Sequence, residues 1–575
     1  MPRKANLEPR KRIERRKRAN GDVYVYEKTT RYDPEKGYEV SLGYRLLGKI
    51  PAGKKDMENT RPRNRKDKSE VKTATRKRVG VTDILKWIGD ESGIDDDLLR
   101  STDKGTAQKI LSIAWYWTAN PGSTLPPMEE WQINHDVPYS YGVSMDAIYD
   151  LMEQVGYDES IRQKFFTYRA SRSPSGSAIA YDSTTVSSYS ENQIEVRYGL
   201  SKDGRSEKIV KFLTQYNLET GQPVAYSRQP GNIADMKSLV NAAKQLSVLG
   251  MEKPMLVMDG GYYSEENMGY LIHSHIKFLV RGRLNVAWVK EQMDQVFPTL
   301  DQLTNNCPFD TGVYGITVTI KHAFQRTIQK DHGKSSRGDV VSEEHRLYLH
   351  LFLDKPKHEI EKSDLAYDIR RIQAQLEAGV EIINADEQRL MDKYLIIKNT
   401  KKGKSIQYND AAFMKDTAYA GCMVLISNAP MNTFNALHHY RKREKIEEYF
   451  RTDKQSFDAN LTRVWKPESL NGRIFCQFVS ICYTEFFKKR LKDLKEELAV
   501  PNGDPVHDSA ENMKAEKQLL NWLNKMSIKR LFDWFDCIEK VEVDNGFGKK
   551  RWTTETTTGD RLFLRKMGII KDQDI

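Results

Sequence analysis

The sequence has little that would place the protein in a membrane, outside the cell or on a zinc scaffold. No apolar run approaches the roughly 20 residues of a transmembrane helix, and the basic N-terminus lacks the apolar stretch of a secretory signal. The five cysteines among 575 residues are scattered and form no C-x2-C pair, which argues against a zinc ribbon. Their odd number, and the apolar neighbours of Cys476 and Cys482, predict reduced thiols in a cytoplasmic protein.

A nucleotide-binding P-loop is also missing. The pattern G-x4-G-K-[ST] does not occur, because the GKS tripeptides at 333–335 and 403–405 both lack the upstream glycine at the required spacing. The sequence therefore gives no sign of ATP-driven chemistry.

The chain does have ample material for folded domains. Hydrophobic residues make up 39% of it, with 28 Tyr, 20 Phe and 9 Trp. Its length is too great for one hydrophobic core, so about two to four domains are expected.

The positive charge is concentrated at the N-terminus. Residues 1–80 hold 25 Lys and Arg against 11 Asp and Glu, a net +14, whereas the rest of the chain holds 66 against 69, a net −3. Concentrated positive charge favours a polyanion partner, most simply DNA, gripped by a mobile arm at 1–18 and a second arm or linker at 61–78. A localisation signal or a solubilising tail would have the same composition.

The segment at 440–454, YRKREKIEEYFRTDK, is the most informative part of the chain. Its spacing is Y-x2-R-x3-E-x6-K. A single helix would place four of its side chains on one stripe, namely Arg443, Glu447, Arg451 and Lys454. One carboxylate among cations suits metal-dependent phosphate chemistry, because the acid holds a divalent cation and the cations hold a phosphate. A solvent-exposed helix with i,i+4 ion pairs would show the same pattern.

Two further acids follow short apolar runs. Asp182 follows the run at 177–181 and precedes small hydroxylic residues, and Asp259 follows the run at 254–258 and precedes two glycines. A carboxylate at the end of a strand, before a permissive turn, is how open α/β sheets present functional groups. With Glu447 the two acids would form the oxygen-rich site expected for Mg²⁺. Each Asp taken alone is more often a strand-end cap or a turn former.

Together these residues resemble the DDE transposases of bacterial insertion sequences, in the large group whose signature is Y-R-E-K around the last acid. The match is made by the four signature residues and the two strand-borne acids: Tyr440, Arg443, Glu447, Lys454, Asp182 and Asp259. The apolar run at 472–487 also resembles the helix that follows the signature in that group. The likeness spans about residues 140–490.

The resemblance implies an α/β fold in which an RNase H-like catalytic core is interrupted by a mainly β insertion domain. In that core the first and fourth strands carry the first two acids. The candidate strands are 177–181, 194–198, 209–216, 223–227 and 254–258, with a helix at 233–246 before the last one. They are one too many, and 194–198 is interpreted as a loop. Asp259 and Glu447 are 188 residues apart, far more than a plain core needs, so the insertion is placed at 284–428.

The insertion carries one residue with a possible role in cleavage. In hairpin-forming members of the group, an aromatic residue of the insertion stacks on a base flipped out near the cleavage point. Trp288 is the only tryptophan at 284–428, and stacking would contribute about 1–3 kcal/mol per base. An anchor that holds the insertion on the core is the alternative role for this side chain.

The predicted domain order has six parts. Basic arms and a small β hairpin unit occupy 1–80, and a helical DNA-binding region occupies 81–170. The catalytic core consists of 171–283 and 429–500, on either side of the β-rich insertion at 284–428. A C-terminal helical region covers 501–575, and the corresponding helices of related transposases help to form the dimer.

The chemistry that the resemblance implies is in-line phosphoryl transfer with two Mg²⁺ ions, for which Mn²⁺ can substitute. Asp182 would bridge both ions, while Asp259 and Glu447 would each complete one. The side chains expected to contact DNA are Tyr440, Arg443, Arg451, Lys454 and Trp288. The partners would be double-stranded DNA, as transposon terminal inverted repeats and target DNA, bound by a homodimer at the nucleoid in the cytoplasm. Cut-and-paste movement through hairpin intermediates is the pathway implied.

Three other interpretations use the same sequence features. An RNase H-like endonuclease without strand transfer would share the acids, but the Y-R-E-K spacing and the β insertion argue against it. A domesticated transposase acting as a DNA-binding protein would be favoured by loss of an acid, and all three are present. A nucleoid protein built on the basic N-terminus leaves most of the chain unexplained.

Overall fold

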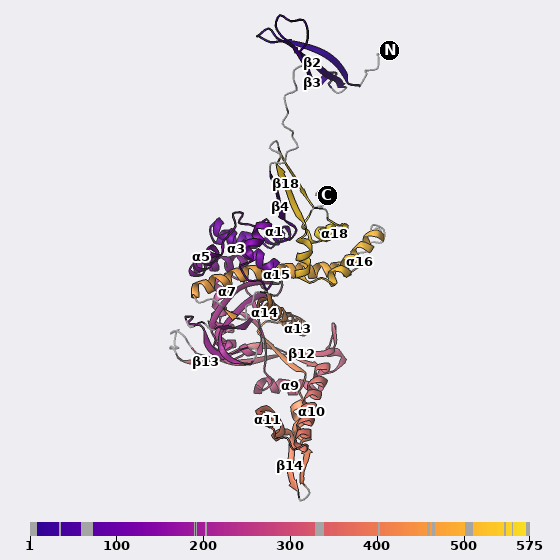
Figure 1. The fold of residues 1–575 in the computed structure, drawn as a ribbon. Coiled ribbons are helices and arrows are strands. Elements are labelled where there is room, and N and C mark those ends of the chain that lie inside the picture. The colour runs from indigo at the N-terminus through magenta and orange to yellow at the C-terminus, as the bar shows by residue number, and fades with distance from the viewer. Residues whose placement is uncertain are drawn as a thin grey trace. The chain divides into compact units, whose positions relative to one another are not determined.

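The computed structural model of the chain describes residues 8–33, 36–58, 73–188, 190, 192–201, 204–327, 338–400, 403–456, 461–462, 466–500, 510–544, 548–554 and 556–570. The chain divides into two compact units. The first consists of Met1–Thr75 with Val541–Trp552, and the second of Arg76–Lys540 with Thr553–Ile575. Figure 1 labels their elements. Among the described residues, no helix combines the length and the apolar character that crossing a bilayer requires.

The first unit contains an antiparallel sheet of three strands. Their order is β1 (Arg10–Lys17), β2 (Val23–Asp33) and β3 (Tyr38–Ile50). The hairpin predicted around 22–50 is confirmed. The mobile arm predicted at 1–18 is wrong for residues 10–17, because they form β1 and pair with β2. Glu14 and Glu27 bond to cations of β1 and offset the repulsion within this basic strand.

A bundle of helices begins the second unit, as predicted for 80–160. Its members are α1 (Gly80–Ser92), α2 (Ile94–Ser101), α3 (Lys104–Ala119), α4 (Met128–Asn134), α5 (Met145–Tyr157) and α6 (Glu159–Ser171). Asp103, Ser144 and Asp158 cap α3, α5 and α6 by accepting hydrogen bonds from backbone N–H groups of the first turn. The bundle packs against α15 (Pro467–Ala499), so segments about 350 residues apart share one core.

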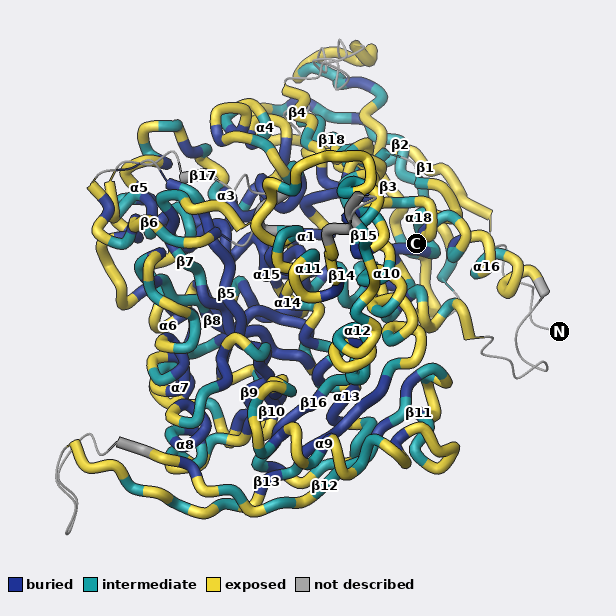
Figure 2. Tube along the Cα trace, turned by 90° about the horizontal axis from the view of Figure 1, so that it is seen from below, coloured by how far each residue is buried: buried dark blue, intermediate teal, exposed yellow. Residues whose placement is uncertain are grey.

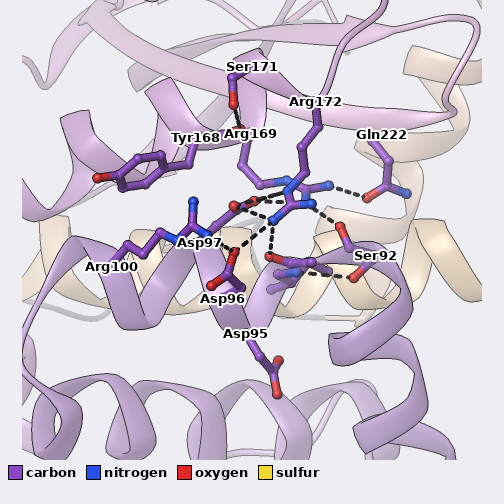
Figure 3. Close-up of polar contacts among 12 residues, drawn as sticks. Ser92, Asp95, Asp96, Asp97, Arg100, Tyr168, Arg169, Ser171, Arg172 and Gln222 are labelled. Atoms are coloured by element: carbon purple, nitrogen blue, oxygen red, sulfur yellow. Dashed lines mark hydrogen bonds and ion pairs between the residues drawn. The ribbon is translucent and has the colours of Figure 1, made fainter.

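A partly buried cluster of ion pairs joins α2 and α6 within the bundle, and a hydrogen bond connects it to the sheet (Figure 3). Arg169 on α6 contacts the Asp97 carboxylate of α2 at 3.2 Å and donates to the Gln222 side chain of β8 at 3.0 Å. Arg172 donates to both Asp97 oxygens at 2.8 Å through two of its nitrogens. Arg169 and Asp97 are both almost fully buried, so the charge of Arg169 is compensated by Asp97, and that of Asp97 by Arg169 and Arg172 together.

The main sheet is mixed and large. Its strand order is β11-β12-β13-β16-β10-β9-β5-β7-β6, with β8 paired to β7 and β17 to β5. The bounds are β5 (Ala178–Ser188), β6 (Arg197–Leu200), β7 (Ser206–Asn217), β8 (Gln222–Pro230), β9 (Met255–Met258), β10 (Lys277–Arg281), β11 (Asn306–Cys307), β12 (Asp310–Thr327), β13 (Val340–Asp354), β16 (Cys422–Ser427) and β17 (Leu461–Thr462). Strands β5, β9 and β10 run parallel, whereas β7 and β16 are antiparallel to their neighbours. The central strands are buried, as their dark blue colour in Figure 2 shows.

The observed strands differ from three of the strand predictions. The strand expected to end before Asp182 continues to Ser188, because the Thr and Val residues that follow suit a sheet and pair with β7. The candidate at 194–198 is a loop only in part, since β6 begins at Arg197. Strands β12, β13 and β16 of the insertion extend the same sheet as β10. The prediction that the insertion is mainly β is wrong, because the helices Ala287–Leu300, Lys355–Glu377, Ala385–Tyr394 and Asp410–Thr417 also lie in it and occupy a comparable part of its length.

Some helices of the second unit lie near the sheet, and others belong to a smaller module. The helices near the sheet are α7 (Leu239–Val248), α8 (Glu265–His273) and α9 (Ala287–Leu300). The module has its own small core around Ile369, Ile372, Tyr394 and Leu395. It consists of α10 (Lys355–Glu377), α11 (Ala385–Tyr394), α12 (Asp410–Thr417) and the hairpin of β14 (Leu395–Thr400) and β15 (Gly403–Tyr408).

The C-terminal region is mainly helical. It contains α16 (Ala510–Asn524), α17 (Ile528–Phe535) and α18 (Thr558–Met567). Strands β18 (Glu539–Asp544) and β19 (Lys549–Thr553) form a sheet with β4 (Thr73–Arg78). All five cysteines are free thiols, and Cys476 and Cys482 are buried on α15.

Candidate active site

The Y-R-E-K signature lies on two helices. Tyr440 belongs to α13 (Thr433–Lys442), and Glu447 belongs to α14 (Glu444–Ser456). Arg443 joins them in a tight turn, in which its carbonyl accepts the N–H of Ile446, three residues on, at 2.9 Å. The prediction of one unbroken helix is therefore wrong. The turn lets α14 bury its apolar residues, Ile446, Tyr449 and Phe450, while the Arg443 side chain stays with the sheet.

The two strand-borne acids are neighbours across the sheet. Tyr181 of β5 pairs with Met258 of β9 in a parallel register. The next residues along the two strands are Asp182 and Asp259, so both acids stand at the same level. Asp182 is in mid-strand and almost fully buried, whereas Asp259 immediately follows β9 and is partly buried.

Arg443 brings all three acids into one contact network. Its Nη1 donates to Asp182 Oδ2 at 3.1 Å, and its Nη2 donates to Glu447 Oε1 at 2.9 Å. The Tyr440 hydroxyl donates to Asp259 Oδ1 at 3.1 Å, and Arg443 lies 5.4 Å from the centre of the Tyr440 ring. The network thus connects the three predicted acids through two residues of the signature.

The electrostatics of the network favour the ionised form of Asp259. Burial acts to raise the pKa of Asp259, but the Gly260 N–H, the Arg443 charge and the Tyr440 hydroxyl outweigh it and hold that pKa below its usual value. Burial and the Asp259 charge raise the pKa of Tyr440 to about 12, so its hydroxyl keeps its proton. Burial acts to lower the pKa of Arg443, yet the surrounding acids and Tyr440 raise it, so the guanidinium stays charged.

A family model of the transposase DDE domain matches residues 173–483, which is more than half of the chain and includes all three acids. The chain belongs to the DDE transposase family. It is accordingly an enzyme that cleaves and transfers DNA, and transposases of this family use divalent metal ions.

Comparisons with curated proteins and with solved structures give less information about the family. A search of curated proteins finds no match to the transposase. Among solved structures, the cryo-EM structure of the piggyBac transposase synaptic complex with hairpin DNA is similar, with 11% identity and a TM-score of 0.33. The similarity covers 76% of this chain and 82% of that one.

The donor set of the transposase fits a divalent ion, although no metal cage is preformed. Three carboxylates around one site supply the hard oxygen ligands that Mg²⁺ and Mn²⁺ prefer. Within the described ranges, no group of three or more His, Cys, Asp or Glu side chains is arranged to hold a metal ion. The Arg443 guanidinium occupies the position between Asp182 and Glu447 instead, and neutralises charge that a metal would neutralise.

A cavity of about 440 Å³ lies beside the network. Tyr440, Arg443 and Glu447 reach it, and Asp182 and Asp259 are not among its lining residues. Arg451, predicted to contact DNA, also lines this cavity and is exposed. Lys454 lies on α14, but its side chain is outside the described residues.

Sequence reasoning missed three cations that line the same cavity, namely Arg281, Lys357 and Arg441. Arg281 had a detectable signal, because it ends the strand that runs parallel to β9 and so reaches the same edge of the sheet as Asp259. Lys357 and Arg441 gave no signal, since only the folded chain brings α10 and α13 to one cavity.

Trp288 lies near the start of α9 and is partly buried. Its ring stacks on His322 with centroids 4.2 Å apart, and its Nε1–H donates to Glu265 Oε1 at 3.2 Å. His322 also contacts Glu265, at 3.1 Å. The indole of the transposase is therefore held by β12 and α8, and no described contact connects it to the three acids.

Proposed function

We propose that Asp182, Asp259 and Glu447 are the catalytic carboxylates of the transposase and hold two Mg²⁺ ions, which Mn²⁺ can replace. The observation that carries the proposal is the Arg443 bridge between Asp182 and Glu447, with Asp259 attached through Tyr440. Asp182 and Asp259 are 77 residues apart in the sequence, and Asp259 and Glu447 are 188 residues apart. Ordinary surface carboxylates at such distances along the chain would not be expected to contact one arginine and one tyrosine.

The bound ions would activate the attacking oxygen and stabilise the leaving oxygen in an in-line transfer. The protein's own part is to keep the carboxylates ionised and the reacting phosphate in place. The lowered pKa of Asp259 serves the first task. The same acids would serve cleavage at the transposon end, in which water breaks a phosphodiester and leaves a 3′-hydroxyl, and strand transfer, in which that hydroxyl forms a new phosphodiester as a target phosphodiester breaks. Strand transfer needs no ATP, because one phosphodiester is exchanged for another.

Arg443, Arg451 and Lys454 are proposed to hold DNA phosphates. Arg443 Nε is buried and has no hydrogen-bond acceptor among the described groups, so its guanidinium has donor capacity left for a phosphate oxygen. Arg451 faces the cavity from the next turns of α14. Tyr440 keeps its hydroxyl proton near neutral pH and would be able to donate it either to Asp259, as observed, or to a phosphate oxygen.

The fold supports an RNase H-like assignment of the core. The strands β8, β7, β5, β9 and β10 are neighbours in this order, with the first three antiparallel and the last three parallel. We assign the core to 171–283 and 429–500 and the insertion to 284–428. The remaining divisions are 1–80 for the basic unit, 81–170 for helical DNA binding and 501–575 for the C-terminal region.

The biological role proposed is that of an insertion-sequence transposase of the Y-R-E-K group from a bacterium. It would act as a homodimer on terminal inverted repeats and target DNA in the cytoplasm, at the nucleoid, and would move its element by cut and paste through hairpin ends. Trp288 would stack on the flipped base, which requires it to exchange its contact with His322 for the base.

The test is cleavage and strand transfer on a duplex that carries the element's terminal repeat. Replacing any one acid, as Asp182→Asn, Asp259→Asn or Glu447→Gln, should lower the Mg²⁺-dependent cleavage rate by about 10²–10³-fold or more, because metal ions supply several kcal/mol of transition-state stabilisation. DNA binding without metal should persist.

The matched control is Glu496→Gln, which removes an exposed acid of α15 whose contact with Lys492 is 3.7 Å long. It should cleave normally. Wild-type-like cleavage by any of the three acid variants would remove that residue from the proposed site. Cleavage without strand transfer would instead support an endonuclease.

A further inference from the structure

The β1–β2–β3 sheet has two open faces that differ in chemistry. Directly opposed residues of neighbouring strands share a face. Arg16 pairs with Tyr24, Arg12 pairs with Lys28, and Lys28 pairs with Tyr44. These five residues, together with Tyr26, define what we call the tyrosine face. The described helices all belong to the second unit, so no helix of this unit covers either face.

On the tyrosine face, cationic side chains lie over tyrosine rings. The Arg16 guanidinium lies 4.6 Å from the centre of the Tyr44 ring and 5.5 Å from that of Tyr26. The Lys28 ammonium lies 5.3 Å from the Tyr44 ring, and the Tyr26 and Tyr44 rings meet edge to face at 6.3 Å. Rings that hold cations in this way reduce the conformational entropy lost when those cations bind a ligand.

This arrangement is exposed although it contains three tyrosines. Tyr44 is 45% exposed, and half of the Arg16 side chain is accessible. Glu14 and Glu39 neutralise part of the charge, at 2.8 Å from Arg16 and 3.6 Å from Arg12. The described part of the sheet unit still carries an excess of cations, and six of the eight residues of β1 are Lys or Arg.

The opposite face of β1 carries the same charge without the rings. Lys11, Ile13, Arg15 and Lys17 alternate with the residues of the tyrosine face. Their partners on β2 are Thr29, Glu27, Val25 and Val23. The two faces therefore separate the effect of charge alone from the effect of charge combined with aromatic side chains.

We propose that the tyrosine face binds duplex DNA, with Arg12, Arg16 and Lys28 on phosphates and the tyrosine hydroxyls donating to the backbone. Tyrosine, arginine and lysine are donors that position proteins on the DNA backbone, and β-sheets are an established means of lying on a duplex. Arginine in particular is the residue suited to bidentate phosphate contacts. The inference rests on the chain being an enzyme of DNA, and it is independent of which residues cut.

The experiment measures binding of the full-length chain to a 30-base-pair duplex without divalent ions, by fluorescence anisotropy at several salt concentrations. The variant Arg12→Gln/Arg16→Gln/Lys28→Gln should lose about tenfold or more in affinity. The slope of log K against log salt should become shallower by about 2 to 3, since each phosphate contact contributes about 0.9.

The control Lys11→Gln/Arg15→Gln/Lys17→Gln removes the same charge from the opposite face and should change the slope by less than about 1. A third variant, Tyr44→Leu, keeps every charge and should still weaken binding several-fold. Circular dichroism of each variant checks that the sheet is intact.

Equal losses from the two triple variants would overturn the proposal, because charge alone would then explain binding. So would face-dependent binding to phosphatidylserine vesicles in place of DNA. Failure of the catalytic assignment would look different, since it would leave these binding curves unchanged and would appear only as cleavage by the acid variants.

Discussion

At the scale of the residue, Arg443 is the most constrained side chain of the proposed site. It contacts two carboxylates through different nitrogens, 3.1 Å from Asp182 and 2.9 Å from Glu447. Only a planar guanidinium presents separate donors at this spacing, whereas a lysine ammonium is a single point of charge. The sequence pattern predicted that this arginine would be functional, and its alternative interpretation included an i,i+4 pair with Glu447, which the structure shows. The contact with Asp182 was not predicted.

The variant Arg443→Lys should therefore cleave DNA more slowly, although it keeps the positive charge. We expect single-turnover cleavage to fall by about 10²-fold, the order of loss that a small misplacement of reacting groups causes. The control is Arg389→Lys, whose pair with Asp386 is exposed and lies outside the cavity, so it should tolerate the change. Equal rates for wild type and Arg443→Lys would mean that the bridge has no part in catalysis.

A second residue-scale prediction concerns the buried pair in Figure 3. Arg169→Met should lower the free energy of unfolding by about 3 kcal/mol, because it leaves the buried Asp97 with one partner fewer. Arg100→Met breaks an exposed pair with Asp96 in the same cluster and should cost less than about 1 kcal/mol. Urea titrations of the two variants measure the difference, and similar midpoints would contradict it.

Asp95 gives a prediction about pH. Burial raises its folded-state pKa to about 6, from an ordinary value of 3.8, although the Tyr483 hydroxyl donates to it and partly offsets the rise. Between these two values the folded state holds more protons than the unfolded chain, so stability falls as pH rises through the window. Figure 3 shows Asp95 pointing away from the cluster around Arg169.

Asp95→Asn keeps an acceptor for Tyr483 and removes the buried charge. It should stabilise the protein by on the order of 1–3 kcal/mol at pH 7.5, with the gain shrinking as pH falls towards 4. Paired melting curves from pH 4.5 to 7.5 measure the gain. A gain that does not depend on pH would contradict the assigned pKa.

At the scale of the element, the sequence predicted what depends on local pattern and failed where distant contacts decide. The run before Asp259 is short, buried and closed by glycines, and β9 ends there as predicted. The run before Asp182 gave a similar signal, yet β5 continues from the predicted end at residue 181 to Ser188, because β7 is available to pair with Thr184, Thr185 and Val186. The break at Arg443 could not be predicted either, since the carboxylates that attract its side chain come from elsewhere in the chain.

The crossing of α5 and α15 depends on two glycines. A Cβ at Gly472 would lie 1.9 Å from the Met152 carbonyl oxygen, and one at Gly156 would lie 1.7 Å from the Glu468 oxygen. Neither glycine was singled out by its sequence context, because close approach of two helices is a tertiary property. The pair fixes how near α15 comes to the bundle.

Gly472→Ala should force the two helices apart and destabilise the protein by about 1–3 kcal/mol. Gly559→Ala is the control, because its Cβ would meet nothing nearer than 3.8 Å and alanine favours a helix. Thermal melting should separate the two variants clearly. A melting temperature for Gly472→Ala equal to that of wild type would show that the contact relaxes at no cost.

At the scale of the whole molecule, charge and chemistry occupy different parts of the sequence. The first 80 residues carry a net +14 and none of the three acids, while the rest carries −3 and all of them. The composition indicated this division. In the structure, residues 10–17 of the arm predicted at 1–18 form a strand of the three-stranded sheet. A catalytic part with a slightly negative net charge would attract DNA only weakly over a distance without that basic unit.

The oligomer is a prediction at the same scale. With terminal-repeat DNA we expect two chains and two duplexes per complex, as light scattering coupled to size exclusion would measure. Mixing active chains with Glu447→Gln chains should then lower cleavage out of proportion to the active fraction if the two chains cleave interdependently. A complex of one chain and one duplex would contradict the homodimer.

The Arg443 bridge has a consequence for the stability of the protein in the absence of metal ions. Three neighbouring carboxylates without a counterion would repel one another and loosen the sheet edge that carries them. A tethered guanidinium gives this transposase a built-in counterion, so the idle enzyme can remain folded without magnesium. If the acids hold Mg²⁺ as proposed, the ions would neutralise Asp182 and Glu447 in its place, and the Arg443 guanidinium would then be available to a DNA phosphate.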